Sequence, residues 1–162
     1  MRVTQHSNMA EISNGVRPPP VVHHYNETSW FDMVPGERIS FRVRSTQVNG
    51  RYSIMDSLAG PGSATPRHSH VEDEIFYIID GTLTFAVGEE VFDVQPGGVV
   101  VAPAGTSHAW KNRTDSEVHM LVIFSPGGIE NLFSKLAGID PEHFEAEAAK
   151  YGSLILGPPI EG

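Results

Sequence analysis

Apolar and polar residues alternate along the middle of the chain. Between residues 37 and 44, Ile39, Phe41 and Val43 fall on one side of an extended strand, and three arginines fall on the other side. A period of two is typical of a strand that buries one face and exposes the other. The arginines could bind an anionic substrate, but we favour an outer face that lies in solvent or in salt bridges.

Further short segments of this kind follow, each bounded by glycine or proline. The sequence contains 16 glycines and 12 prolines, which gather where short strands would have to turn. Short strands separated by such turns predict an all-β domain, with a hairpin around Gly88. The expected strands lie at residues 52–58, 74–80, 83–87, 91–94, 99–102 and 118–124, with one more that carries His108.

The C-terminal third changes from a period of two to a helical period. Asp140 and Pro141 suit the start of a helix, as N-cap and first helical residue, and Gly152 would end it. The apolar tail at residues 154–160 must pack against one end of the β domain or against a neighbouring chain. An earlier amphipathic helix is predicted by Ile129, Leu132, Phe133, Leu136 and Ala137.

Residues 1–20 show neither period and end in three consecutive prolines, which exclude a helix or a central strand. We expect an irregular arm, either disordered or laid across a neighbouring chain. The sequence leaves open whether Met1 or Met9 is the true start. His23 and His24, which follow the arm, are interpreted as polar arm residues and not as metal ligands.

Length, charge and composition narrow the classes of function. At 162 residues the chain is expected to form one domain, and its formal net charge of −9 argues against a nucleic-acid partner. The absence of cysteine excludes disulfides and thiolate chemistry. No apolar run is long enough to span a membrane, and the N-terminus has no apolar signal core, so we expect a cytoplasmic protein without a membrane partner.

Two histidines and a glutamate stand close together in the chain. His68 and His70 are two residues apart, so both rings point to one face of an extended strand. Glu74 follows at the start of the next expected strand. Neutral imidazoles with one carboxylate form a donor set that suits a divalent first-row transition metal.

A second stretch, residues 97–112, strengthens this interpretation, and with it the sequence resembles the cupin superfamily. Both family motifs are matched at every fixed position. The layout of the two motifs and of the segment after the last strand is most similar to single-domain cupins related to quercetin (flavonol) dioxygenases. The first motif is matched by Gly62, His68, His70, Glu74 and Gly81, and the second by Gly97, Pro103, Gly105, His108 and Asn112.

The resemblance implies a cupin double-stranded β-helix, a jelly-roll barrel with a short C-terminal helical segment and a metal inside. It implies that the metal ligands are His68, His70, Glu74 and His108, and that Glu74 also acts as a catalytic base. One divalent ion per chain is expected, and the ligands do not select among Fe, Ni, Mn, Co, Cu and Zn. The expected parts of this single domain are an N-terminal arm (1–36), the barrel (37–126) and C-terminal helices with an apolar tail (127–162).

Strand alternation selects the residues expected around the metal. Phe76 and Ile78 share a face with Glu74, and Trp110 shares a face with His108, so these three are candidate substrate-binding residues. Plain barrel core is the alternative for each of them.

Two further features near the motifs concern the strand at 118–124 and the acidic residues Glu72 and Asp73. The strand at 118–124 has no defined phase: either Met120, Val122 and Phe124 face inward, or His119, Leu121 and Ile123 do. Glu72 and Asp73 do not match the motif, and we interpret both as surface charge.

Three functions are compatible with these residues. The first hypothesis, which the resemblance implies, is an O₂-dependent dioxygenase of flavonol or enol-type substrates. The second is a non-redox metal-dependent enzyme, such as a polyketide cyclase, isomerase or lyase, in which the metal polarises a carbonyl. The third is a cupin that binds a small molecule without turnover.

The expected partners are a small-molecule substrate, with O₂ under the first hypothesis, and a second copy of the chain. The apolar outer face formed by Ile75, Tyr77 and Ile79 needs burial, which another sheet of the same barrel or a homodimer could supply.

Overall fold

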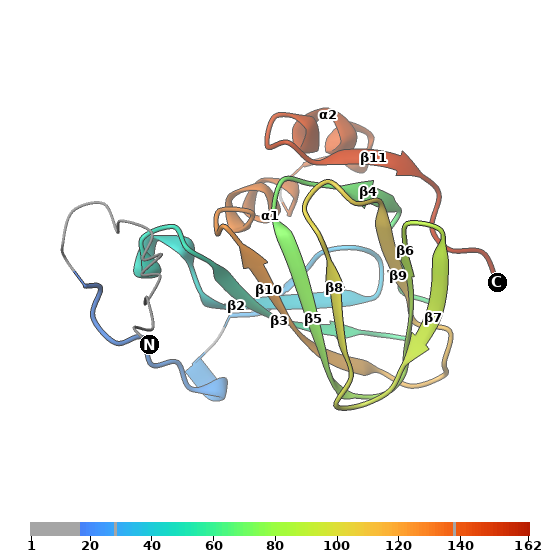
Figure 1. The fold of residues 1–162 in the computed structure, drawn as a ribbon, viewed down its shortest axis with the longest axis horizontal. Helices are drawn as coiled ribbons and strands as arrows, with labels where there is room; N and C mark the ends of the chain where they lie inside the picture. The colour runs from blue at the N-terminus through green and yellow to red at the C-terminus, as the bar shows by residue number, and fades with distance from the viewer. Residues whose placement is uncertain (1–16, 28, 138) are drawn as a thin grey trace, which may run out of the picture.

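Strands form most of the structure, a computed structural model that describes residues 17–27, 29–137 and 139–162 (Figure 1). They build two antiparallel sheets: a larger sheet in the order β1-β2-β3-β10-β5-β8 and a smaller one in the order β11-β4-β9-β6-β7. The strands are β1 (Phe31–Asp32), β2 (Glu37–Val43), β3 (Ser53–Ala59), β4 (Arg67–Ser69), β5 (Asp73–Asp80), β6 (Leu83–Val87), β7 (Glu90–Val94), β8 (Val99–Ala102), β9 (His108–Lys111), β10 (Val118–Ser125) and β11 (Leu154–Gly157).

The two sheets close around one shared core. Phe76 of β5, Phe85 of β6, Trp110 of β9 and Val122 of β10 are all buried in the same cluster. Each segment that the sequence predicted as a strand forms one, and β6 and β7 form the expected hairpin. The all-β class and the jelly-roll barrel are confirmed.

The phase of β10 is resolved by burial. Met120, Val122 and Phe124 face the core and are at most 1% exposed. His119 lies on the outer face, where its Nε2 is 2.8 Å from Oδ1 of Asp56. The first of the two phases left open by the sequence is therefore the correct one.

The arginines of β2 lie on the outer face, as predicted. Arg42 forms an ion pair with Asp56, and its guanidinium lies 4.8 Å from the ring centre of Tyr25 and 5.7 Å from that of Trp30. Both rings belong to the segment before β2: Tyr25 begins the short turn η1 (Tyr25–Glu27), and Trp30 follows this turn. This segment therefore covers part of the outer face of the larger sheet.

Two helices and a strand of the C-terminal segment lie over one end of the barrel (Figure 1). Helix α1 (Glu130–Leu136) buries Leu132 and packs Phe133 against the core, as its apolar spacing predicted. The second helix begins with a 3₁₀ turn, η3 (Pro141–His143), in which Oδ1 of Asp140 accepts the Glu142 amide at 3.1 Å. It continues as α2 (Phe144–Ala149), and Gly152 follows with a φ of 77°.

Two strands lie outside the range of 37–126 that was predicted for the barrel. β1 adds an edge strand to the larger sheet before residue 37, and β11 adds one to the smaller sheet within the apolar tail. β11 pairs with β4, where Ile155 stands opposite His68. The tail therefore packs on its own barrel, beside one of the motif histidines.

The remaining predictions for the chain ends have separate outcomes. Most of the predicted irregular arm (1–20) and the choice between Met1 and Met9 fall on residues 1–16, which lie outside the described residues. Residues 17–20 form neither helix nor strand, and His23 and His24 are exposed. Another 3₁₀ turn, η2 (Ser45–Val48), follows β2. Among the described helices, none is long and apolar enough to cross a membrane.

Candidate metal centre

Four motif side chains meet between the two sheets. His68 lies in β4 and stands opposite His108, the first residue of β9, in the smaller sheet. His70 follows directly after β4, and Glu74 lies near the start of β5 in the larger sheet. One donor atom from each of the four lies within 4.8 Å of all the others.

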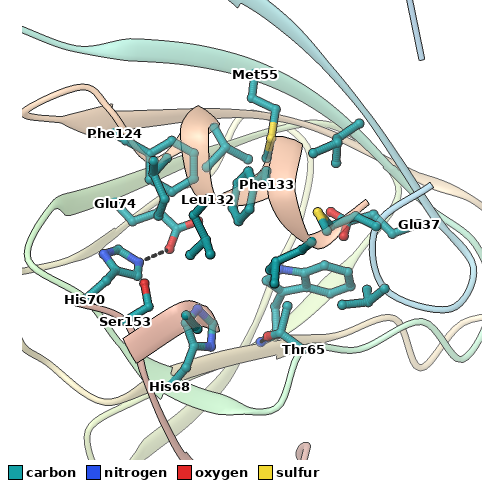
Figure 2. A pocket seen from close by; sticks show the side chains of 18 of the residues that line it. Glu37, Met55, Thr65, His68, His70, Glu74, Phe124, Leu132, Phe133 and Ser153 are labelled. Atoms are coloured by element: carbon teal, nitrogen blue, oxygen red, sulfur yellow. Dashed lines mark hydrogen bonds and ion pairs between the residues drawn. The ribbon is translucent and has the colours of Figure 1, made fainter. Parts of the chain in front are cut away.

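Glu74 is at the middle of this cluster, which we call the His/Glu centre. Its Oε2 lies 2.9 Å from Nε2 of His70 (Figure 2) and 2.8 Å from Nε2 of His108. Two ligands at right angles on one metal, with bonds of about 2.1 Å, would stand roughly 3 Å apart. The observed separations are therefore those of neighbouring ligands of a single ion.

Backbone carbonyls orient all three histidine rings. Because a carbonyl oxygen only accepts hydrogen bonds, Nδ1 must carry the hydrogen in each ring, and a neutral ring keeps its lone pair on Nε2. A hydrogen bond from Nδ1 to a carbonyl oxygen is typical of histidines that bind a metal through Nε2, since it fixes both ring orientation and tautomer. The acceptors are the carbonyls of Pro66 for His68 at 2.8 Å, Glu72 for His70 at 3.1 Å and Thr106 for His108 at 2.8 Å.

The donor set needs protons or a metal ion between its members. When both rings are neutral, the carboxylate of Glu74 and the Nε2 atoms of His70 and His108 present lone pairs to one another, so protons or a metal ion must lie between them. Three neutral nitrogens and one carboxylate would leave a divalent ion with positions open for substrate, which is typical of catalytic sites. The residues therefore fit the predicted metal, and their role as its ligands stays a prediction.

Burial and mutual contact shift the pKa values in this centre. Burial, with the neighbouring His108, lowers the pKa of His68 to about 4. Burial acts to raise the pKa of Glu74, but hydrogen bonds with His108 and His70 outweigh it and lower the pKa to about 2. Near neutral pH the centre therefore holds an unprotonated His68 and an ionised Glu74.

His70 differs from His68, because two carboxylates flank its ring. Burial acts to lower its pKa, but hydrogen bonds with Glu72 and Glu74 outweigh burial and raise the pKa to about 9. Glu72, which the sequence placed on the surface, is buried, and its Oε2 lies 3.2 Å from Nδ1 of His70. That prediction was wrong, because the bend after β4 turns Glu72 back onto the ring. The interpretation of Asp73 as a surface charge is correct: it is exposed, and its Oδ1 accepts the Ala104 amide at 2.8 Å.

An apolar pocket of about 140 Å³ opens beside the His/Glu centre (Figure 2). Phe76 and Trp110 line it, as the sequence predicted for substrate walls. Ile78 does not: it is fully buried in the core, which was the alternative reading. Much of the remaining wall comes from the C-terminal segment, namely Ile129, Leu132, Phe133, Leu136, Phe144, Ala148, Ser153 and Ile155.

A further carboxyl group lines this pocket and was not singled out from the sequence. Glu37, at the start of β2, is 5% exposed, and its Oε1 accepts a hydrogen bond of 2.6 Å from the Ser57 hydroxyl. The signal was available: Glu37 has the same parity as Ile39 and Phe41, so the alternation already placed a charged residue on the buried face.

Comparison with known proteins gives a family match over the middle of the chain. The model described as "Cupin domain" matches residues 58–124. The chain is 32% identical over 65 residues to an uncharacterized protein of Streptomyces coelicolor, across 40% of this chain and 61% of that protein.

Two further relatives are named as dioxygenases. Identity is 32% over 66 residues with 5-nitrosalicylic acid 1,2-dioxygenase of a Bradyrhizobium species, across 41% of this chain and 32% of the relative. Identity is 27% over 73 residues with acireductone dioxygenase of a Sulfurihydrogenibium species, across 42% of this chain and 41% of the relative. The chain therefore spans less than two thirds of the length of each of these three relatives.

Solved structures show the same barrel. KdgF from a Halomonas species superposes with a TM-score of 0.62 at 20% identity, over 70% of this chain and 99% of that one. The polyketide cyclase RemF from Streptomyces resistomycificus superposes with a TM-score of 0.56 at 16% identity, over 63% of this chain and 76% of RemF. At these identities the likeness concerns the fold alone.

Proposed function

Residues 58–124 form a cupin domain, and on that premise we propose that this chain is a metal-dependent enzyme that acts on a small organic molecule. The reaction that we propose is the O₂-dependent dioxygenation of an enol-type substrate, a class that includes flavonols and hydroxy-aromatic compounds. One observation carries the proposal: the donor atoms of His68, His70, Glu74 and His108 converge at the wall of an apolar pocket. A donor set with open positions beside a dry cavity supports chemistry on a bound substrate.

The side chains have distinct tasks in this proposal. A metal at the His/Glu centre would supply a binding position for the substrate hydroxyl and would make that hydroxyl more acidic. Glu74, ionised near neutral pH, accepts the hydroxyl proton on its carboxylate. Phe76 and Trp110 hold the ring by apolar contact and exclude water, because both are buried in the pocket wall.

Two relatives support the choice of an oxygen-using reaction. Both the Bradyrhizobium and the Sulfurihydrogenibium proteins are named as dioxygenases, and they match 41% and 42% of this chain. The second candidate, a non-redox cupin enzyme, is supported by the donor set itself, which suits zinc as well as iron. A binding module without turnover is the remaining alternative.

For the assembly we propose a homodimer. Tyr77 and Ile79 are 43% and 41% exposed on the outer face of β5. A second copy of the chain would remove this apolar surface from water. The small-molecule substrate, the cytoplasmic location and the absence of a nucleic-acid partner, which the net charge of −9 supports, belong to the same proposal.

Oxygen consumption tests the proposed reaction. Protein loaded anaerobically with Fe²⁺, Ni²⁺, Mn²⁺, Co²⁺, Cu²⁺ or Zn²⁺ is mixed with hydroxy-aromatic compounds, enediols and flavonols in an oxygen electrode. We expect O₂ uptake with at least one redox-active metal and incorporation of label from ¹⁸O₂ into the product. His108→Ala should lose this uptake, and His23→Ala, at an exposed histidine outside the His/Glu centre, is the matched control.

The alternatives give different results in the same experiment. Substrate loss without oxygen in the zinc-loaded protein would favour the non-redox enzyme. Binding of these compounds without any turnover would favour the binding module.

A further inference from the structure

The pocket contains an ionisable group that the proposed reaction does not use. Among the described lining residues, Glu37 is the ionisable side chain outside the His/Glu centre. Figure 2 shows it across the pocket from Glu74 and His70, with Leu132 and Phe133 between them. Its position at the far wall places it where the opposite end of a bound molecule would lie.

The surroundings of Glu37 favour the protonated form of its carboxyl group. The side chain receives hydrogen bonds from the Ser57 hydroxyl and from the Val34 backbone, and no cation among the described residues pairs with it. Burial raises the pKa of Glu37 to about 7, so a large share of the carboxyl groups keep their proton near neutral pH. A protonated carboxyl in an apolar pocket can donate a hydrogen bond as well as accept one.

A plain structural role does not explain an acid at this position. A buried carboxyl without a cation destabilises the fold, and a glutamine could hold the Ser57 hydroxyl equally well. Such perturbed acids concentrate at functional sites. Its place in the wall of an apolar pocket makes Glu37 available to a polar group of a bound molecule.

The volume of the pocket limits what can lie between Glu37 and the His/Glu centre. An apolar cavity of about 150 Å³ is known to hold one benzene ring, and this pocket measures about 140 Å³. A single ring fits this space without displacement of the wall, whereas a three-ring flavonol would have to extend beyond it. The wall of Phe76, Trp110 and Phe133 is suited to the faces and edges of such a ring.

We propose that the substrate is a single-ring hydroxy-aromatic compound, or an equally compact enol, with a second, uncharged polar substituent on the far side, and that Glu37 selects it by hydrogen-bonding that substituent. This inference rests on the proposed function, because the hydroxyl end is taken to lie at the His/Glu centre. The substituent is uncharged because an anionic group would be repelled by the fraction of Glu37 that is ionised.

Binding of two matched probes tests the inference without turnover. 4-Ethylcatechol and 4-(hydroxymethyl)catechol differ by a methyl group in place of a hydroxyl, and quercetin serves as the three-ring probe. Each is titrated calorimetrically into zinc-loaded protein under nitrogen. We expect 4-(hydroxymethyl)catechol to bind about tenfold more tightly than 4-ethylcatechol, and both to bind more tightly than quercetin.

Variants of the pocket assign the preference to one residue. Glu37→Leu should abolish or reverse the preference for the hydroxymethyl probe, while Glu37→Gln, which keeps polar atoms and shape, should retain it. Ser153→Ala, which removes another polar side chain from the wall, is the control and should leave it unchanged. Thermal melting of each variant confirms folding, and if Glu37→Leu does not fold, Glu37→Met replaces it.

Several results would overturn the inference. Equal binding of the two catechols by the wild-type protein would remove the role of Glu37, and so would loss of the preference in Ser153→Ala but not in Glu37→Leu. Tighter binding of quercetin would contradict the single-ring limit. Metal analysis before titration records whether zinc is bound: a protein without zinc would contradict the proposed function, and the same titration of the metal-free protein would still compare the two catechols.

Discussion

Nδ1 of His70 lies 3.1 Å from the carbonyl oxygen of Glu72 and 3.2 Å from the carboxylate of the same residue. The carbonyl accepts the hydrogen bond of this ring nitrogen, and the carboxylate lies within ion-pair range of it, so together they hold the His70 ring with Nε2 directed at Glu74. A carboxylate behind a ligating histidine raises the basicity of that histidine and holds its orientation. Glu72 is therefore a positioning residue for the His/Glu centre.

Replacing Glu72 should weaken metal binding without emptying the site. We predict that Glu72→Gln lowers the affinity for Co²⁺ by about 10- to 100-fold, the usual effect of losing such a partner. Competition with a chromogenic chelator measures the affinity. Glu90→Gln, an exposed glutamate at the start of β7, is the control. Unchanged affinity in Glu72→Gln would mean that the backbone carbonyl alone orients His70.

Glu74 is expected to act on the substrate as well as on the metal. In Glu74→Gln, metal-loaded protein should lose about 10²- to 10⁴-fold in kcat, because the amide cannot accept the hydroxyl proton. Steady-state kinetics of variant samples with the same metal content as wild type measure this effect. A Glu74→Gln protein that keeps metal and full activity would remove the role of Glu74 as a base.

The buried acid Glu37 should make stability fall as the pH rises. Its pKa is raised from 4.5 in the unfolded chain to about 7 in the fold, so between these values the unfolded chain has released the proton while the folded protein keeps it. Stability from this group is fully present below pH 4.5 and is lost as the pH rises through about 7. The loss is about 3 kcal/mol, since each pKa unit corresponds to about 1.4 kcal/mol.

A comparison with Glu37→Gln isolates this contribution. The groups that face Glu37 are the Ser57 hydroxyl, the Val34 backbone and, at longer range, the charge of Glu74, and all are unchanged in the variant. Urea unfolding of metal-free wild type and Glu37→Gln at pH 5 and pH 8 should show the variant gaining about 3 kcal/mol relative to wild type. Parallel behaviour at the two pH values would show that Glu37 ionises equally in both states.

Substitutions at Ile78 and Phe76 should distinguish a residue that only packs in the core from one that also binds the substrate. Ile78→Ala is expected to reduce the free energy of unfolding by about 2–5 kcal/mol, because Ile78 is fully buried. It should leave the dissociation constant of 4-(hydroxymethyl)catechol unchanged, since Ile78 does not line the pocket. Phe76→Ala should lower both stability and affinity. An affinity loss in Ile78→Ala at a temperature where it is folded would place Ile78 at the binding site.

Alternation and turn residues were sufficient to predict an all-β domain, and the resemblance carried by the two motifs implied the barrel and the four residues that meet in it. The two motifs place His68, Glu74 and His108 by strand position and turn length, which are local properties of the sequence. Position along a strand also showed which residues share a face. It could not show which of Phe76 and Ile78 reaches the pocket, because both face inward and only the packing of other elements separates them.

Features that depend on contacts distant in sequence were not predicted. The tail forms β11 because β4 offers it an unpaired edge, and no alternation in residues 154–157 signalled this. Glu72 is buried because a bend turns it onto His70, and the sequence gives no sign of the direction of that bend. The phase of β10 was open because both of its faces are apolar, apart from His119.

The central claim, a metal held by the His/Glu centre, is tested most directly by the metal content of the purified protein. Protein prepared without tag or chelator is analysed by mass spectrometry of the elements, beside His68→Ala and the control His23→Ala, at an exposed histidine. We predict about one divalent transition metal ion per chain in wild type and in His23→Ala, and a large loss in His68→Ala. Wild-type protein that binds no transition metal even after reconstitution, or His68→Ala protein that keeps a full equivalent, would contradict the claim.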